Sequence, residues 1–226
     1  MKLATYQARD LLALQRARQI ERRRDWLKCS GYTGTWSELM FVNKSDYTAY
    51  ASSSTEGSLL AGGGNEQPII PATFWLGKPG TLRTISLLAR GVLSTTSTPT
   101  IIFQVRIGST SGSSFLSGTS VGVSAAITTQ SGVSNKWWEL RLDLVCTITG
   151  IGTGNTTLAG AGVVKSPGGF ASPFTYALEP TTPDTATWTA TVDGSVTNYC
   201  NLSATFSASS SSNTCTCKQL FMAGLN

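Results

Sequence analysis

The stretch KWWELRLDLVCTI, residues 136–148, has the strictest alternation in the chain and indicates its fold class. Apolar residues occupy every second position from 138 to 148, while Glu139, Arg141 and Asp143 fall between them. Successive side chains of a β-strand point to opposite faces, so this period of two places one face in a core and the other in solvent. The segment therefore predicts a long, half-buried strand.

The same alternation recurs through residues 68–226. It is clear in TIIFQVRIG and in VTNYCNLSATF, where polar or charged residues separate apolar ones. Further strand candidates are 69–76, 82–92, 115–127, 157–165, 186–192 and 214–222. Turn-forming clusters of Ser, Thr, Gly and Pro separate these runs, and no helical pattern lies between them. Eight or nine such strands predict a mainly β protein with an antiparallel, jelly-roll-like β-sandwich.

The N-terminal segment has a different composition. Residues 1–28 hold eight Lys or Arg and three Asp or Glu, a net charge of +5, whereas the remainder holds nine of each. Helix-forming residues fill 3–27, and neither Gly nor Pro occurs before Gly31, so this segment predicts one α-helix. The Gly- and Ser-rich composition that follows predicts a flexible connector. The expected domains are therefore a basic helix at 1–29, a connector at 30–67 and the β-sandwich at 68–226.

The basic segment is the part of the chain for which the sequence suggests a partner. We expect it to dock on another protein, with apolar anchors inside a charged rim. The residues expected to make this contact are Arg16, Arg18, Ile20, Arg22, Arg23, Arg24, Trp26 and Leu27. Two alternatives stay open: contacts between its arginines and nucleic-acid phosphates, and a solvated helix face with local ion pairs. Glu21 and Asp25 interrupt the positive charge, which makes nucleic acid the less expected partner.

The chain contains no histidine, and this count excludes several kinds of active site. Ser-His-Asp and Cys-His nucleophilic sites and the two-histidine zinc helix all require that residue. Cys215 and Cys217 would need two further soft ligands to hold zinc. Glu139 and Asp143 could serve as the carboxylate pair of a glycosidase, but alternating charges around Arg141 are typical of a solvated strand surface. The sequence therefore predicts no catalytic, metal or cofactor site, and no enzyme.

The cysteines and the apolar runs suggest where the chain folds. The five cysteines are odd in number and irregularly spaced, which favours free and mostly buried thiols. No apolar run approaches the roughly 20 residues of a membrane-spanning helix. Arg9 and Asp10 interrupt the place where a signal peptide would have its apolar region. We therefore expect folding in a cytoplasm, where thiols stay reduced, and no membrane partner.

Three stretches of the body have a pattern of strands and turns that is found in one group of proteins. They are LRTISLLARGVLSTTSTPTIIFQVRIGSTSG (82–112), WWELRLDLVCTITGIG (137–152) and NLSATFSASSSSNTCTCKQLFMAGLN (201–226). In strand rhythm, and in a last strand that follows a Ser-rich turn, they resemble the small jelly-roll structural proteins of tailed-bacteriophage virions. The resemblance covers about 140 residues of the body and no invariant motif, and the basic segment lies outside it.

The resemblance implies a non-catalytic virion component without a cofactor. Proteins of this kind are capsid decoration, cement or head-fibre proteins, commonly homotrimers, and their partners are the major capsid protein or neighbouring structural proteins. Such a protein would be located in the virion after assembly in the host cytoplasm.

Two other functions remain open. A tail-associated module that binds host carbohydrate would use exposed aromatic side chains, for which the candidates are Trp36, Trp75, Trp137 and Trp188. A capsid protein that contacts the genome would instead use the basic segment on the inside of the particle.

Overall fold

The computed structural model describes residues 37–51, 53–62, 67–76, 83–112, 116–150, 155–180 and 189–225. They belong to one compact unit and form fourteen strands and one short 3-10 helix. These elements are β1 (Ser37–Val42), β2 (Tyr50–Ala51), β3 (Gly57–Ser58), β4 (Ile69–Ile70), η1 (Phe74–Leu76), β5 (Thr84–Ser94), β6 (Thr100–Gly108), β7 (Thr119–Ser124), β8 (Ile127–Thr128), β9 (Lys136–Ile148), β10 (Thr156–Lys165), β11 (Thr175–Glu179), β12 (Thr189–Val192), β13 (Asn198–Phe206) and β14 (Thr214–Leu225).

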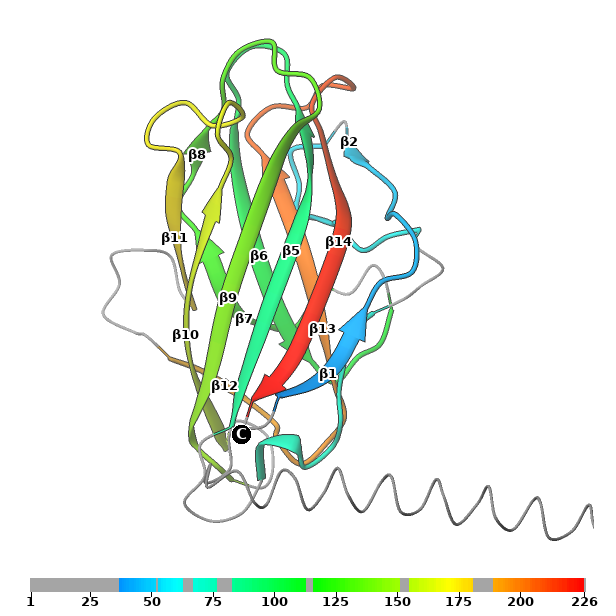
Figure 1. The fold of residues 1–226 in the computed structure, drawn as a ribbon, viewed down its shortest axis with the longest axis vertical. Helices are drawn as coiled ribbons and strands as arrows, with labels where there is room; N and C mark the ends of the chain where they lie inside the picture. The colour runs from blue at the N-terminus through cyan, green and yellow to red at the C-terminus, as the bar shows by residue number, and fades with distance from the viewer. Residues whose placement is uncertain are drawn as a thin grey trace, which may run out of the picture. The chain divides into compact units, whose positions relative to one another are not determined.

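All fourteen strands belong to one antiparallel sheet, which folds over on itself. The strand order is β1-β14-β5-β9-β10-β11-β7-β6-β13-β3, and the four short strands β12, β2, β4 and β8 pair with β10, β14, β13 and β6. The strands β1, β14, β5, β9 and β10 form a front layer, and β7, β6 and β13 lie behind it (Figure 1). The short strand β3 pairs with β13. The ring centroids of Phe103 on β6 and Trp138 on β9 are 5.0 Å apart, although these strands are four places apart in the sheet order. The two layers therefore share one core.

Alternation along the strands fills this core. In β5 and β6 every second residue is buried and the residues between are half-buried. Trp138, which is fully buried, needs a glycine beside it on the neighbouring strand. A Cβ at Gly91 would overlap the carbonyl oxygen of Thr216 and would lie 2.7 Å from Cζ2 of Trp138. The front layer therefore packs around the indole only with glycine at position 91.

The predicted strands 100–108 and 136–148 match the structure in their bounds, and the other candidates differ from it by two or more residues or, like 115–127, are divided between two strands, except 157–165, which differs by one. β9 covers the predicted range 136–148, but Ile148 is 59% exposed because the register between β9 and β10 shifts next to it. The candidate 69–76 contains only the two-residue strand β4 and then η1. Pro71 follows β4 directly, and a residue without an N–H cannot continue a strand ladder.

The expected fold class, a jelly-roll-like sandwich preceded by an α-helix and a flexible connector, is wrong as stated. The strands form one continuous sheet rather than two separate sheets. Much of the expected connector belongs to the body, because β1 and β2 pair with β14, and β3 pairs with β13. No α-helix occurs in the part of the chain that the structure describes. The helix predicted over 3–27 lies outside that part and has no support from it.

Four of the five cysteines are described, and they confirm the prediction of free, buried thiols. Cys146, Cys200, Cys215 and Cys217 are all unpaired and buried. Burial raises the pKa of Cys200 and Cys217 to about 12 and raises the pKa of Cys146 and Cys215 as well. Cys29 lies outside the described residues. The thiolate is the form of cysteine that reacts with electrophiles and oxidants. Burial and protonation therefore both protect these four side chains from such reactions.

We expect iodoacetamide to leave these four cysteines unmodified in the native protein at pH 8. The same reagent should modify all four after unfolding in urea, since both sources of protection are then lost. Peptide mapping by mass spectrometry gives the modified fraction of each cysteine. Rapid native modification of Cys215 or Cys217 would contradict their burial in β14.

Candidate functional site

The outward side of the front layer carries the most unusual group of side chains. Strand register aligns Lys165 of β10, Glu139 of β9, Arg90 of β5 and Gln219 of β14 in one row across it. The next row across the same four strands contains Val163, Arg141, Leu88 and Phe221, and Val42 of β1 continues it. We call the outward side chains of these five strands the β9 face.

Glu139 lies at the centre of the β9 face and is held by three cations. Arg90 donates from Nε to Oε2 of Glu139 at 2.8 Å. Arg141 donates from Nε to Oε1 at 2.8 Å, and Nζ of Lys165 lies 3.1 Å from the same oxygen. The carboxylate side chain is only 3% exposed, whereas those of Arg90, Arg141 and Lys165 are 43%, 61% and 38% exposed. The aliphatic parts of long cationic side chains can cover such a group while their charged ends stay in water.

The cations decide the protonation state of Glu139. Burial alone raises the pKa of this carboxyl, but the hydrogen bonds from Arg90, Lys165 and Arg141 outweigh burial and lower the pKa from 4.5 to about 2. Glu139 is therefore ionised at any physiological pH. A glycosidase acid requires a raised pKa, so this residue is unsuited to that role.

The two arginines keep their terminal nitrogens for other contacts. Both contact Glu139 through Nε, and none of the hydrogen bonds to this carboxylate uses an Nη atom. Nη1 of Arg90 has only a long contact, 3.5 Å, with Oε1 of Gln219. Among the described residues, the Nη atoms of Arg141 have no hydrogen-bond partner. A guanidinium fixed in this way presents a fork of donors that matches an external carboxylate.

Exposed apolar side chains also occur on the strands that carry this charged row. The exposed large apolar residues of the described chain are concentrated on strands of the front layer, at Leu39, Val42, Trp137, Ile148, Val163 and Leu225. Ile69, Phe174 and Val196 are the ones that lie elsewhere. Trp137 is 46% exposed and pairs with Val92 of β5 beside the Glu139 row. Exposed tryptophan, arginine and aliphatic side chains together are typical of a surface that binds another molecule.

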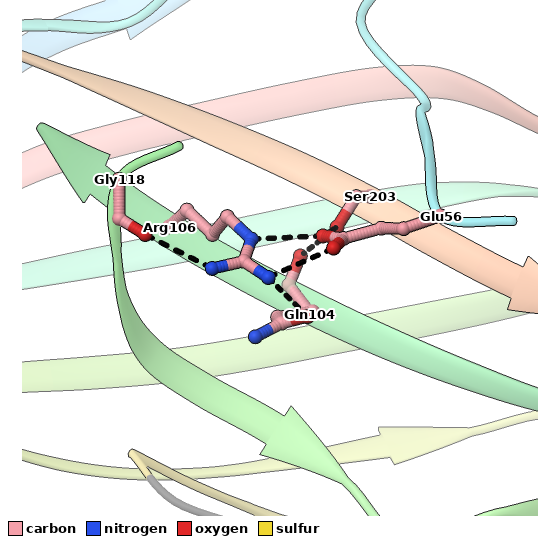
Figure 2. A network of polar contacts seen from close by, with 5 residues as sticks. All are labelled: Glu56, Gln104, Arg106, Gly118 and Ser203. Carbon is pink, nitrogen blue, oxygen red and sulfur yellow. Dashed lines mark hydrogen bonds and ion pairs between the residues drawn. The ribbon is translucent and has the colours of Figure 1, made fainter. Parts of the chain in front are cut away.

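A second charged group lies on the back layer and is fully used within the body (Figure 2). Arg106 of β6 donates from Nε and Nη2 to the two carboxylate oxygens of Glu56, each at 2.8 Å, and from Nη1 to the carbonyl oxygen of Gly118 at 2.9 Å. Ser203 of β13 donates to Oε1 of Glu56 at 2.6 Å. Burial raises the pKa of Glu56, but the hydrogen bonds from Arg106 and Ser203 outweigh it, so the pKa is lowered. This network attaches the segment before β3 to the back layer and leaves few donors for a ligand.

We expect Glu56→Gln to lower the free energy of unfolding by about 1–2 kcal/mol, because a bidentate, half-buried ion pair loses its charge. Asp46→Asn is the matched control. Asp46 and Lys218 form an exposed pair at 2.7 Å, with side chains 60% and 45% exposed, and such pairs contribute under about 1 kcal/mol. Urea unfolding of both variants measures the difference. Equal losses in the two variants would contradict the anchoring role of Glu56.

Two hollows in the described chain are weaker candidates for a binding site than the β9 face. One, of about 390 Å³, is lined mainly by Ser and Thr hydroxyls with Asp193 and Asn198. The other lies beside η1 and includes Glu38 and Arg83. Arg83 is partly engaged there: its Nη1 donates to the carbonyl oxygen of Phe74 at 2.7 Å, whereas its buried Nε has no hydrogen-bond partner among the described residues. The lining of neither hollow combines an exposed aromatic ring with unpaired donors as the β9 face does.

Most of the functional residues predicted from the sequence lie outside the part of the chain that the structure describes. The expected docking residues Arg16, Arg18, Ile20, Arg22, Arg23, Arg24, Trp26 and Leu27 all lie outside the described residues. So do Trp36 and Trp188. Trp75 is fully buried and cannot contact a ligand, whereas Trp137 is exposed. Arg90 and Lys165 were missed, although Lys165 is the single charge in the candidate strand 157–165 and Arg90 is one of two in 82–92.

Within the described residues no group of three or more Cys, Asp or Glu could hold a metal ion. No helix among those residues is long and apolar enough to cross a membrane.

The described residues form an all-β body whose front layer carries exposed cationic and apolar side chains. No family model matches the chain, and no curated protein matches it. Among solved structures, the chain is similar to the CBM2 module of the evolved Dit of Lactobacillus casei BL23 phage J-1. The two are 14% identical over 86% of this chain and 98% of that chain, with a TM-score of 0.31. A likeness this low carries no argument about fold or function.

Proposed function

We propose that the chain is a non-enzymatic structural component of a bacteriophage virion, held on the particle by contacts with neighbouring virion proteins. The observation that supports this most directly is the β9 face. It offers tryptophan, arginine and aliphatic side chains on a five-stranded layer, which is the composition of a protein-binding surface. The lowered pKa of Glu139 makes it unsuited to the acid role of a glycosidase.

Within this class we propose a decoration, cement or head-fibre protein, with a homotrimer as its assembled state. The resemblance of the strand segments to phage structural proteins supports this assignment. The partners would be the major capsid protein or adjacent structural proteins, and the basic residues 16–27 would add a second contact. The Ser- and Thr-rich exterior with few charges fits a protein that must not link particles to one another.

The test begins with particles of the phage whose genome encodes the chain. Mass spectrometry of purified particles should detect it in a fixed ratio to the major capsid protein. Particles from a deletion strain should bind the purified full chain again in a co-sedimentation assay. A version that lacks residues 1–29 should bind more weakly, because the basic segment is absent. Absence of the chain from purified particles would contradict the proposed function.

A tail-associated carbohydrate-binding module is a second candidate, and the exposure of Trp137 favours it. Sugar rings stack on such indoles in many binding sites. Binding of isolated host glycans to the full chain, lost in Trp137→Ala, would favour this candidate over the first. A genome-contacting protein would instead retain nucleic acid through purification and release it at high salt.

A further inference from the structure

We infer that the β9 face docks on a protein surface that presents carboxylates, and that Glu139 positions the arginines which bind them. This inference rests on the proposed function, since it assigns the virion contact to a particular face. Arg141 is central to it, because its terminal nitrogens have no partner among the described residues and its side chain is 61% exposed.

The charge balance of the face favours an acidic partner. Arg90, Arg141 and Lys165 face two carboxylates, Glu139 and Asp143. Glu139 already contacts all three cations and is buried beneath them. Asp143 lies two residues from Arg141 on the same strand and makes no ion pair within the described chain. The named charges of the face therefore sum to +1, and the terminal nitrogens of Arg141 have no hydrogen-bond partner among the described residues.

The chain itself does not supply a suitable occupant. Residues 1–28 carry a net charge of +5 and would be repelled by the cations. In a dimer with a two-fold axis through Glu139, the arginines of one copy would face the same arginines of the other copy and repel them. A second copy placed head to tail would have to present free carboxylates, whereas Glu56, Glu139 and Asp46 are already engaged in ion pairs within the body. We therefore place a different molecule on the face.

The apolar part of the face indicates a protein rather than a glycan. Leu39, Val42 and Val163 are 60%, 41% and 39% exposed on the same side as the cations. Branched aliphatic side chains fill pockets between protein side chains, whereas glycans need aromatic platforms, and Trp137 is the sole exposed aromatic on the described part of this face. Aliphatic anchors around a pre-oriented arginine pair correspond to the centre of a protein interface.

The test measures co-sedimentation of the full chain with deletion-strain particles. Arg141→Glu should weaken binding at least about tenfold, because it places a carboxylate against the partner's carboxylates. Lys44→Glu is the matched control. It makes the same change in net charge at an exposed position in the turn after β1, and it should alter binding less than about twofold. Higher salt should weaken binding of the wild type more than that of Arg141→Glu.

An apolar pair of variants tests the other half of the inference. Val163→Ser should weaken binding several-fold, whereas Ile69→Ser, an exposed residue of β4 on the other layer, should not. Glu139→Gln should weaken binding as well, and high salt should then have less effect, because its arginines are no longer held in place. Urea unfolding of each variant confirms that it is folded at the assay temperature.

The outcomes separate the two proposals. Loss of binding in Arg141→Glu and Val163→Ser, with both controls unchanged, supports the inference. Wild-type binding by both variants, with binding lost only on removal of residues 1–29, overturns it and leaves the proposed function in place. Displacement of the chain from particles by polygalacturonate but not by poly-L-glutamate also overturns it, because the occupant is then a glycan. Absence of the chain from purified particles contradicts the proposed function itself.

Discussion

Replacing Glu139 with glutamine will lower the free energy of unfolding by about 3 kcal/mol at pH 7. The folded protein holds the pKa of this carboxyl at about 2, against 4.5 for an unperturbed glutamate, and that difference corresponds to about 3 kcal/mol of stability. A neutral amide cannot satisfy Arg90, Arg141 and Lys165 together. Breaking a buried ion cluster by removing its central charge is among the most destabilising changes a single substitution makes.

The same substitution will change the acid sensitivity of the protein. The folded pKa of Glu139 is depressed, so its contribution is fully present above pH 4.5 and is lost as the pH falls towards 2. Wild-type stability should therefore fall over this window, and the Glu139→Gln variant should fall less steeply. Urea unfolding at several pH values between 7 and 2.5 measures both curves. Asp143→Asn, an exposed carboxylate of the same strand, is the control and should change stability by less than about 0.5 kcal/mol. If stability fell equally with pH in the wild type and in Glu139→Gln, the proposed contribution of the ionised Glu139 to stability would be wrong.

Replacing Trp138 with alanine will lower the free energy of unfolding by about 4 kcal/mol. The indole is fully buried between the layers, lies 5.0 Å from the ring of Phe103, and donates from Nε1 to the carbonyl oxygen of Val92 at 3.3 Å. Removing an aromatic side chain from a core costs about 3–5 kcal/mol, because contacts are lost and a cavity remains. The neighbouring residue Gly91 has no side chain that could fill the cavity left by the indole.

The adjacent tryptophan is a natural control. Trp137 is 46% exposed on the opposite side of the same strand, so Trp137→Ala should lower stability by less than about 1 kcal/mol. Urea unfolding monitored by far-UV circular dichroism compares both variants with the wild type. Comparable losses in the two variants would show that β9 does not place its faces as described.

The sequence was informative where a strand is long enough to show its period. β6 and β9 have nine residues or more, and their alternation identified both their bounds and their inward faces, whereas β5 begins and ends two residues later than its predicted range of 82–92. The strands β2, β3 and β4 have two residues each, too few to show any period, so β2 and β3 were assigned to a connector. Strand order depends on contacts between distant segments, and no pattern within one strand reports it.

Only part of the candidate site could be predicted, because the sequence does not reveal which strands are neighbours. The sequence placed Glu139 and Arg141 on the outward side of one strand and predicted that they are solvated. Glu139 is in fact 97% buried, because the antiparallel register brings Arg90 from β5 and Lys165 from β10 to either side of it. The burial of a charged side chain therefore depended on the order of strands, which the sequence did not provide.

The pairing of β1 with β14 gives the body a direction. Ser37, where the described body begins, is the register partner of Leu225, at its other end in the chain. Both ends of the described body therefore leave from one pole, while the turn at 207–213 precedes β14 at the opposite pole (Figure 1). The twelve residues of β14 separate the poles by roughly 40 Å. A peptide or fluorophore inserted in that Ser-rich turn would therefore lie at the pole opposite Ser37 and Leu225, separated from both by the length of β14.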